Sequence, residues 1–188
     1  MELFIDRVGS PLGTILLVSD GQAMRALDFE DYEQRMHRLL RLHYGSYALT
    51  SARNPAGLSE RIAAYFEGDI LALDSIPVQT GGTPFQRSVW TALRQTPAGK
   101  TMTYGQLARQ IGSPGASRAV GMANGSNPIA IVVPCHRVIG ADGTLTGYGG
   151  GLDRKRWLLA HERANFASDS TTDQESMSQR ESSVGEAK

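Results

Sequence analysis

Hydrophobic and polar residues alternate in short runs over the first 30 residues, the pattern of half-buried strands. The runs are ELFIDRV, TILLVSD and MRALDF, and SPLG lies between the first two as a turn. The sequence therefore predicts three short strands. Helical spacing follows, first near 31–43 with Met36, Leu39, Leu40 and Leu42 as the apolar face, then near 57–67 with Leu58, Ile62, Tyr65 and Phe66. We expect residues 1–80 to form a small α/β domain.

A second segment begins after TGGTP (80–84), where paired glycines before a proline indicate an irregular linker. Helices are expected over 84–95, over 103–112 with Thr103 as N-cap, and from Ser113 onward with Pro114 in the first turn. Two helices joined by a short Gly-containing turn form a helix-turn-helix, although any helical hairpin has a similar pattern. Residues 81–165 are thus expected to form a mainly α domain.

The length of 188 residues is enough for a buried core, and no apolar run approaches the roughly 18–20 residues that cross a bilayer. No secretory signal is visible at the N-terminus, and the single cysteine excludes an internal disulfide or a C-x-x-C zinc site. We expect a cytoplasmic protein without a membrane span or a metal. Residues 166–188 are rich in Ser, Thr and Glu and are expected to be a disordered tail.

Charge is unevenly distributed although the chain is neutral overall. Residues 1–82 hold 7 basic and 11 acidic residues, whereas residues 83–163 hold 10 basic and 3 acidic ones. Such asymmetry is typical of a protein whose basic part binds a polyanion. A solvated basic face without a partner is the alternative.

The helix expected within 113–128 has mostly small side chains, and only Arg118 and Asn124 could contact base edges. Small residues allow close approach to another surface. That surface is either a neighbouring helix or a narrow nucleic-acid groove, and the groove predicts binding without strong sequence preference.

The only cysteine, Cys135, follows the apolar run IVVP and precedes His136 and Arg137. IVVP predicts a buried strand, in which a cysteine is usually a small core residue. However, Pro134 ends regular pairing, and a His-Arg pair is unfavourable to bury without a role. Cys135 is therefore a candidate nucleophile at a strand end.

A reactive cysteine needs a base, and the base needs a carboxylate to orient it. His136 is the nearest base, but neighbours in an extended chain point to opposite sides, so a water is expected to bridge them. Asp153 is expected to cap the last helix, which leaves Glu162 as the best carboxylate.

A Gly-rich loop follows at 139–151 and holds Tyr148. It matches neither phosphate-binding glycine pattern. We interpret it as a pocket wall or lid with Tyr148 exposed for stacking on a planar ligand, with a plain surface loop as the alternative.

The sequence resembles the O6-alkylguanine-DNA alkyltransferases in five segments. These are PCHRV (134–138), SRAVGMANGSNP (117–128), TGYGGGLDRKRWLLAHE (146–162), GGTPFQ and TYGQLA. The resemblance is greatest to the bacterial methylated-DNA–protein-cysteine methyltransferases. It covers most of residues 1–165, and PCHRV with its flanks is highly specific. The extra N-terminal cysteines of the form that also regulates transcription are lacking, which indicates a single module.

This resemblance implies a ribonuclease-H-like first domain without an active site and a single-turnover repair reaction. Cys135 would take the alkyl group from O6 of guanine, or less readily from O4 of thymine, in double-stranded DNA. The thioether is permanent, so no cofactor is needed. The protein would be a monomer, with cooperativity on DNA left open.

The resemblance also assigns roles to individual residues. Cys135, a water, His136 and Glu162 would form a proton relay, and Tyr104 would protonate the departing base. Asn127 would tie the helix to the active-site turn. Recognition of guanine would come from the Val138 carbonyl and the backbone near Tyr148 and Gly149, where glycines at 149 and 150 leave a small wall that could admit larger alkyl groups. Arg118 would enter the minor groove and replace the flipped nucleotide, with Ser113 and Ala119 also at the DNA.

Three other functions compete with this one. A cysteine hydrolase would need an oxyanion hole and a His remote in sequence, and nothing beyond Cys-His supports it. A lesion-binding protein without repair activity would lack the cysteine, so Cys135 argues against it unless the thiol is blocked. A transcription regulator would need a dimer seam and a base-reading helix.

Overall fold

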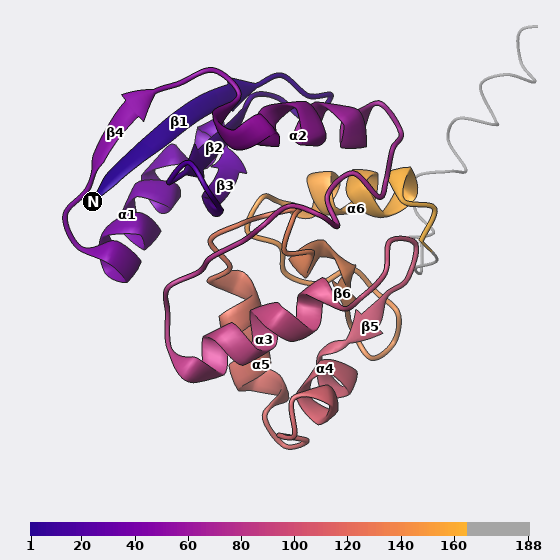
Figure 1. Ribbon diagram of the computed structural model, residues 1–188. Coiled ribbons are helices and arrows are strands. Elements are labelled where there is room, and N and C mark those ends of the chain that lie inside the picture. Colours follow the sequence, from indigo (N-terminus) through magenta and orange to yellow (C-terminus); the bar gives the residue numbers. More distant parts are fainter. Residues whose placement is uncertain (165–188) are drawn as a thin grey trace, which may run out of the picture.

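Four strands of the N-terminal segment form one mixed sheet in the order β3-β2-β1-β4 (Figure 1). The computed structural model describes residues 1–164, so the tail expected at 166–188 lies outside the described residues. Strands β1 (Glu2–Val8), β2 (Ile15–Ser19) and β3 (Met24–Phe29) pair antiparallel and confirm the three predicted strands. β4 (Ala48–Ser51) pairs parallel with β1 and was not predicted, because it is short and mostly exposed.

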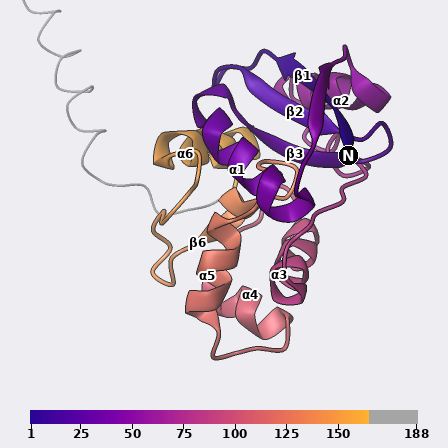
Figure 2. The same cartoon turned by 90° about the vertical axis from the view of Figure 1, so that its left-hand side faces the viewer.

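The two faces of this sheet are covered by different elements (Figure 2). Helix α1 (Glu33–Tyr44) follows the short 3₁₀ helix η1 (Glu30–Tyr32) and packs Met36 and Leu40 on one face. Helix α2 (Leu58–Phe66) follows η2 (Pro55–Gly57) and covers the other face with Leu58, Ile62 and Tyr65. Both predicted helices are confirmed. Leu42, expected on the apolar face of α1, is 72% exposed, because it lies two residues beyond Leu40 and so points to the opposite side of the helix.

The second segment is mainly helical, as predicted. Its elements are α3 (Pro84–Arg94), β5 (Met102–Thr103), α4 (Tyr104–Gln110), α5 (Ser117–Gly125), η3 (Cys135–Arg137), β6 (Val138–Ile139) and α6 (Leu152–His161). Thr103 caps α4 as expected, within a reciprocal capping box with Gln106. The contact between α4 and α5 completes the expected helical pair.

Three local expectations are wrong. Helix α5 starts at Ser117 and not at Ser113, because the Ala116 N–H bonds the Ser113 carbonyl in a separate turn around Pro114. The IVVP run is buried but forms turns, with Ile131 at a positive φ of 68°, so Cys135 follows no strand. Asp153 does not cap α6; it lies in the first turn and pairs with Arg156 at 3.0 Å.

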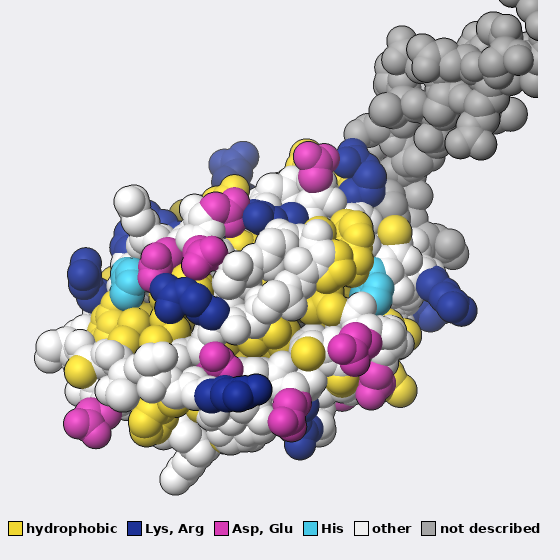
Figure 3. Space-filling model, turned by 90° about the horizontal axis from the view of Figure 1, so that it is seen from above, with side chains coloured by type: hydrophobic (Ala, Val, Ile, Leu, Met, Phe, Trp, Pro, Cys, Tyr) yellow, Lys and Arg dark blue, Asp and Glu magenta, His cyan; other side chains and the backbone are white. Residues whose placement is uncertain are grey.

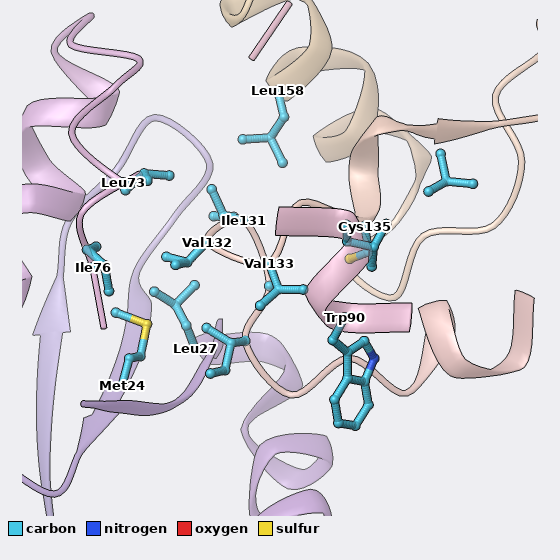
Figure 4. Close-up of a cluster of buried hydrophobic side chains, with 14 of the residues drawn as sticks. Met24, Leu27, Leu73, Ile76, Trp90, Ile131, Val132, Val133, Cys135 and Leu158 are labelled. Carbon is cyan, nitrogen blue, oxygen red and sulfur yellow. The ribbon is translucent and has the colours of Figure 1, made fainter. Parts of the chain in front are cut away.

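One hydrophobic core joins the two segments. Figure 4 shows Ile131, Val132 and Val133 lying between Met24 and Leu27 of β3 and the side chains around Cys135 and Trp90. An isolated bridge between Leu27 and Ile129 continues the sheet toward this run. The turn that carries Cys135 is therefore fixed against the sheet of the first segment.

Among residues 1–164, none of the helices combines the length and the apolar character needed to span a bilayer.

Candidate active site

Cys135 opens the 3₁₀ helix η3 and is only 5% exposed. The Asn127 side-chain amide donates hydrogen bonds to its Sγ at 3.1 Å and to the Val133 carbonyl at 2.8 Å. The Asn127 Oδ1 in turn accepts from the Ile129 N–H at 3.0 Å. Asn127 thus fixes the backbone before the cysteine and gives its sulfur one donor.

Asn124 also serves this turn. It was considered for base readout, but it is 4% exposed and its amide donates to the Cys135 carbonyl at 3.5 Å. That interpretation is therefore wrong, and Arg118 is the polar side chain of the two that remains exposed on α5.

Glu162 lies at the centre of a buried ion cluster just beyond α6. Its Oε1 lies 3.0 Å from Nε2 of His136, and it accepts from Nη2 of Arg137 at 2.8 Å and from the Tyr65 hydroxyl at 2.9 Å. Its Oε2 accepts from Nε of Arg137 at 2.8 Å. Burial alone would raise the pKa of this carboxyl, but the hydrogen bonds and charges of His136 and Arg137 hold it well below the usual range. Glu162 is therefore an anion, as the role of orienting carboxylate requires.

His136 is completely buried, and burial lowers its pKa, so the ring is neutral in the resting protein. An ionised carboxylate can only accept, so His136 must carry its proton on Nε2 and donate it to Glu162. The lone pair is then on Nδ1, which is buried and has no protein partner among residues 1–164. This is the tautomer that a proton acceptor needs.

Burial likewise raises the pKa of the Cys135 thiol, while the Asn127 hydrogen bond and the charges of Arg35 and Lys155 act in the opposite direction. The resting sulfur is therefore a protonated thiol. Reaction requires a base to take that proton, and the neutral His136 is the candidate in the same turn.

Lys155 is a buried cation that the sequence did not single out. It is 0% exposed, and its Nζ donates to the carbonyls of Val138 and Thr146, both at 2.5 Å. Burial lowers its pKa to about 8. Lys155 thus ties β6, which carries the expected guanine-recognition carbonyl, to the Gly-rich loop.

Tyr148 was expected to be exposed on the Gly-rich loop, and that expectation is wrong. Its hydroxyl is buried without a protein partner among the described residues, and its ring meets His136 edge-on at 6.4 Å. The neighbouring glycines face the first segment: a Cβ at Gly149 would meet the Arg35 guanidinium, and one at Gly150 would meet Phe29. Side chains therefore already fill the space on the Cβ side of both glycines. The two glycines do not indicate a pocket large enough for larger alkyl groups.

The helical pair presents a surface beside this loop. Tyr104 begins α4, and its ring packs beside α5, 3.7 Å from a Cβ placed on Gly121. The Tyr104 hydroxyl lies 3.8 Å from a Cβ placed on Gly147. Arg118 and Ala119 are exposed at the start of α5, and Ser113 is half-buried in the preceding turn.

Basic residues of the second segment divide between the surface and the interior. Arg87, Lys100, Arg109, Arg118 and Arg163 are exposed, whereas Arg137 and Lys155 are buried and bind carboxylate or carbonyl groups. Over β1, β4 and α2, by contrast, charges of both signs are interspersed (Figure 3). The sequence count therefore overstates the positive charge that can meet a polyanion.

The structure brings Cys135, Asn127, His136, Glu162 and Tyr148 together in one buried site and leaves Arg118, Ala119 and Ser113 outside it. Sequence reasoning missed the roles of Tyr65, Asn124 and Lys155. For Lys155 a signal existed, because it lies three and four residues before Leu158 and Leu159 and therefore on the same face of the helix. No group of three or more metal-binding side chains is present in residues 1–164.

Comparisons with known proteins cover nearly the whole described chain. The family model "6-O-methylguanine DNA methyltransferase, ribonuclease-like domain" matches residues 7–80, and "6-O-methylguanine DNA methyltransferase, DNA binding domain" matches residues 84–164. The methylated-DNA–protein-cysteine methyltransferase of Salmonella typhimurium is 55% identical over 165 residues, covering 86% of this chain and 96% of that protein.

The Mycobacterium tuberculosis protein of the same name is 44% identical over 167 residues, covering 87% of this chain and 94% of its own. The crystal structure of Mycobacterium tuberculosis OGT in complex with DNA has a TM-score of 0.71 at 40% identity, covering 87% of this chain and 93% of that one.

Proposed function

The chain belongs to the 6-O-methylguanine DNA methyltransferase family, and from this premise we propose that Cys135 is the residue that takes the alkyl group. The protein is a DNA-binding repair methyltransferase of the methylated-DNA–protein-cysteine class. The observation that supports Cys135 is its buried environment, with an amide donor on the sulfur and a neutral histidine fixed by an ionised glutamate in the same turn.

The reaction is an in-line displacement. The Cys135 thiol gives its proton through a water to Nδ1 of His136, and the resulting imidazolium is stabilised by Glu162. The sulfur then forms a bond to the alkyl carbon while the bond from that carbon to O6 of guanine breaks. The electron pair stays on the base, and a thioether stays on the protein. The protein is consumed in one turnover and uses no cofactor.

Release of the base needs a proton on the departing guanine, and Tyr104 donates it. The Tyr104 phenolate then regains a proton from solvent or from His136. Recognition of guanine comes from the Val138 carbonyl and from the backbone at Tyr148 and Gly149. Lys155 supports this recognition, because it holds the Val138 carbonyl and the loop at a fixed separation. O4-alkylthymine is a poorer substrate of the same pocket.

Delivery of the base requires flipping, since Cys135 is buried and cannot reach a stacked nucleotide. Arg118 on α5 enters the duplex through the minor groove and fills the gap, and Ala119 and Ser113 line the contact. Exposed Arg87, Lys100 and Arg109 supply phosphate contacts, so affinity falls with salt. Double-stranded DNA carrying the lesion is thus the partner.

We also propose the domain organisation, the oligomeric state and the location of the protein. We assign residues 1–80 and 81–165 to two domains, the first scaffolding the second. The protein acts as a monomer in the cytoplasm, where bacterial DNA is accessible. Titration of DNA with the protein would measure whether binding along the duplex is cooperative.

The test is intact mass followed by peptide mapping, after mixing the protein with a duplex carrying one O6-methylguanine. One methyl group per protein, located on Cys135, is the expected result. Cys135→Ala should abolish transfer and keep DNA binding, because the side chain touches no DNA before flipping. Methyl transfer by Cys135→Ala would refute the mechanism, and an unmodified wild type that binds the lesion would indicate a damage-recognition protein.

A further inference from the structure

Tyr65 is the point at which the first domain reaches the catalytic ion cluster. It lies on α2, is 0% exposed, and its hydroxyl donates to Oε1 of Glu162 at 2.9 Å across 97 residues of sequence. The same oxygen is the one beside Nε2 of His136. Among the hydrogen bonds of residues 1–164, the Tyr65 bond is the one that joins the first domain to Glu162, His136 or Cys135.

Both ends of Tyr65 are tied to α6. His161 Nε2 lies 2.7 Å from the Tyr65 carbonyl, and the two rings meet edge-on at 5.0 Å. On the other side Phe66 meets the Tyr65 ring at 5.2 Å. The hydroxyl therefore has little freedom to leave Glu162, and its position depends on how α2 packs against α6.

We propose that Tyr65 is a positioning residue of the first domain, and that its hydrogen bond keeps Glu162 a pure acceptor, so that the relay proton stops on His136. This inference rests on the proposed relay of Cys135, His136 and Glu162. It gives the first domain a part in the chemistry besides scaffolding.

Three donors converge on one oxygen of Glu162. His136, Tyr65 and Nη2 of Arg137 all lie at Oε1, whereas Oε2 accepts only from Nε of Arg137. Each donor stabilises negative charge on Oε1 and lowers its basicity. The proton in the bond between His136 and Glu162 therefore stays on Nε2. Arg137 alone already holds the carboxylate in place, so the Tyr65 bond is more than an anchor.

The direction of the electrostatic effect follows. A donor to a carboxylate stabilises its charged form and weakens its pull on the Nε2 proton of His136. Without the hydroxyl, Glu162 would bind that proton more strongly, and the imidazolium would be favoured. Several other charged or titratable groups lie near His136, Glu162 and Tyr65, namely Arg137, Lys155, His161, Tyr148 and Cys135. Arg35 acts on the sulfur of Cys135. None of them changes in a Tyr65→Phe protein.

The experiment is the pH profile of alkyl transfer from free O6-benzylguanine, which needs no DNA binding or flipping. His136 must be neutral to accept the thiol proton, so the rate falls on the acid side as His136 becomes protonated. In Tyr65→Phe we expect this acid limb to move to higher pH by about half a unit. Tyr44→Phe is the matched control, because its hydroxyl donates to the Gln79 carbonyl, outside the hydrogen bonds of the ion cluster, and its profile should equal that of wild type.

A second variant covers the case in which the phenylalanine protein does not fold. Replacing Tyr65 alone by 3-fluorotyrosine keeps the ring and makes the hydroxyl a stronger donor, so the acid limb should move to lower pH. Opposite shifts in the two variants support the proposal. An acid limb identical to wild type in either folded variant overturns it, even if thermal stability falls, since that loss alone indicates a structural role. If wild type itself leaves Cys135 unalkylated, the proposed function fails and not only this inference.

Discussion

Replacing Lys155 by Met tests how the active site holds a buried charge. The ammonium is fully buried and bonds two carbonyls, those of Val138 and Thr146. Methionine has a similar length and no donor, so it keeps the packing and removes both bonds. The variant should transfer alkyl groups more slowly, because the recognition carbonyl and the loop are no longer joined.

The magnitude for stability comes from the pKa. Burial lowers the pKa of Lys155 from its ordinary 10.5 to about 8. Each pH unit between these values corresponds to about 1.4 kcal/mol, so the buried charge costs about 3 kcal/mol at pH 7. Below pH 8 both folded and unfolded chains hold the proton, and the full cost is present. As the pH rises from 8 toward 10.5 the folded chain loses the proton first, so the stability of wild type rises.

The assay is urea unfolding of wild type and Lys155→Met from pH 7 to pH 10. The difference in unfolding free energy should change in favour of wild type by about 2–3 kcal/mol over this range. Arg156→Met is the control, because Arg156 is 42% exposed on the same helix and removal of its charge should give no such slope. A difference that stays flat for Lys155→Met would refute the account of a buried, charged lysine.

Two further predictions concern other parts of the molecule. Arg118→Ala should slow repair in duplex DNA far more than reaction with free O6-benzylguanine, measured as two second-order rate constants; equal losses would exclude a flipping role. Gly150→Ala should lower the free energy of unfolding by about 1–3 kcal/mol, because its Cβ would lie 2.8 Å from both Phe29 and Tyr148. Gly125→Ala, in open space on α5, should instead be neutral or stabilising in the same urea titration.

Local sequence determined most of the secondary structure and the reactive centre. The alternation in ELFIDRV and TILLVSD and the 3.6-residue spacing around Ile62 and Leu93 are consequences of which side chains face the core, so strands and helices could be predicted from them. Thr103 predicted the start of α4, because its side chain accepts a hydrogen bond from an N–H of the first turn. Cys135, His136 and Glu162 predicted a cysteine nucleophile with a base and a carboxylate, because a His-Arg pair is rarely buried without a role. Alkyl transfer itself was implied by the resemblance to the alkyltransferases.

Local patterns failed where tertiary packing decides. IVVP looks like a strand because β-branched residues favour extended chain, but Asn127 and the sheet of the first domain hold it in turns. Ser113 before Pro114 has the sequence pattern of a helix N-cap. However, the Ala116 N–H bonds the Ser113 carbonyl and closes a separate turn before α5 begins.

Contacts between residues distant in sequence could not be predicted either, because tertiary packing decides them. Whether Tyr65 donates to Glu162, whether Lys155 holds two carbonyls, and whether Asn124 faces DNA or the Cys135 carbonyl depend on how α2, α5 and α6 meet. Periodicity indicates which face of a helix is buried, because most apolar side chains gather on that face. It does not tell what that face is buried against, and a hydrogen bond or a shifted pKa depends on the identity of the neighbour.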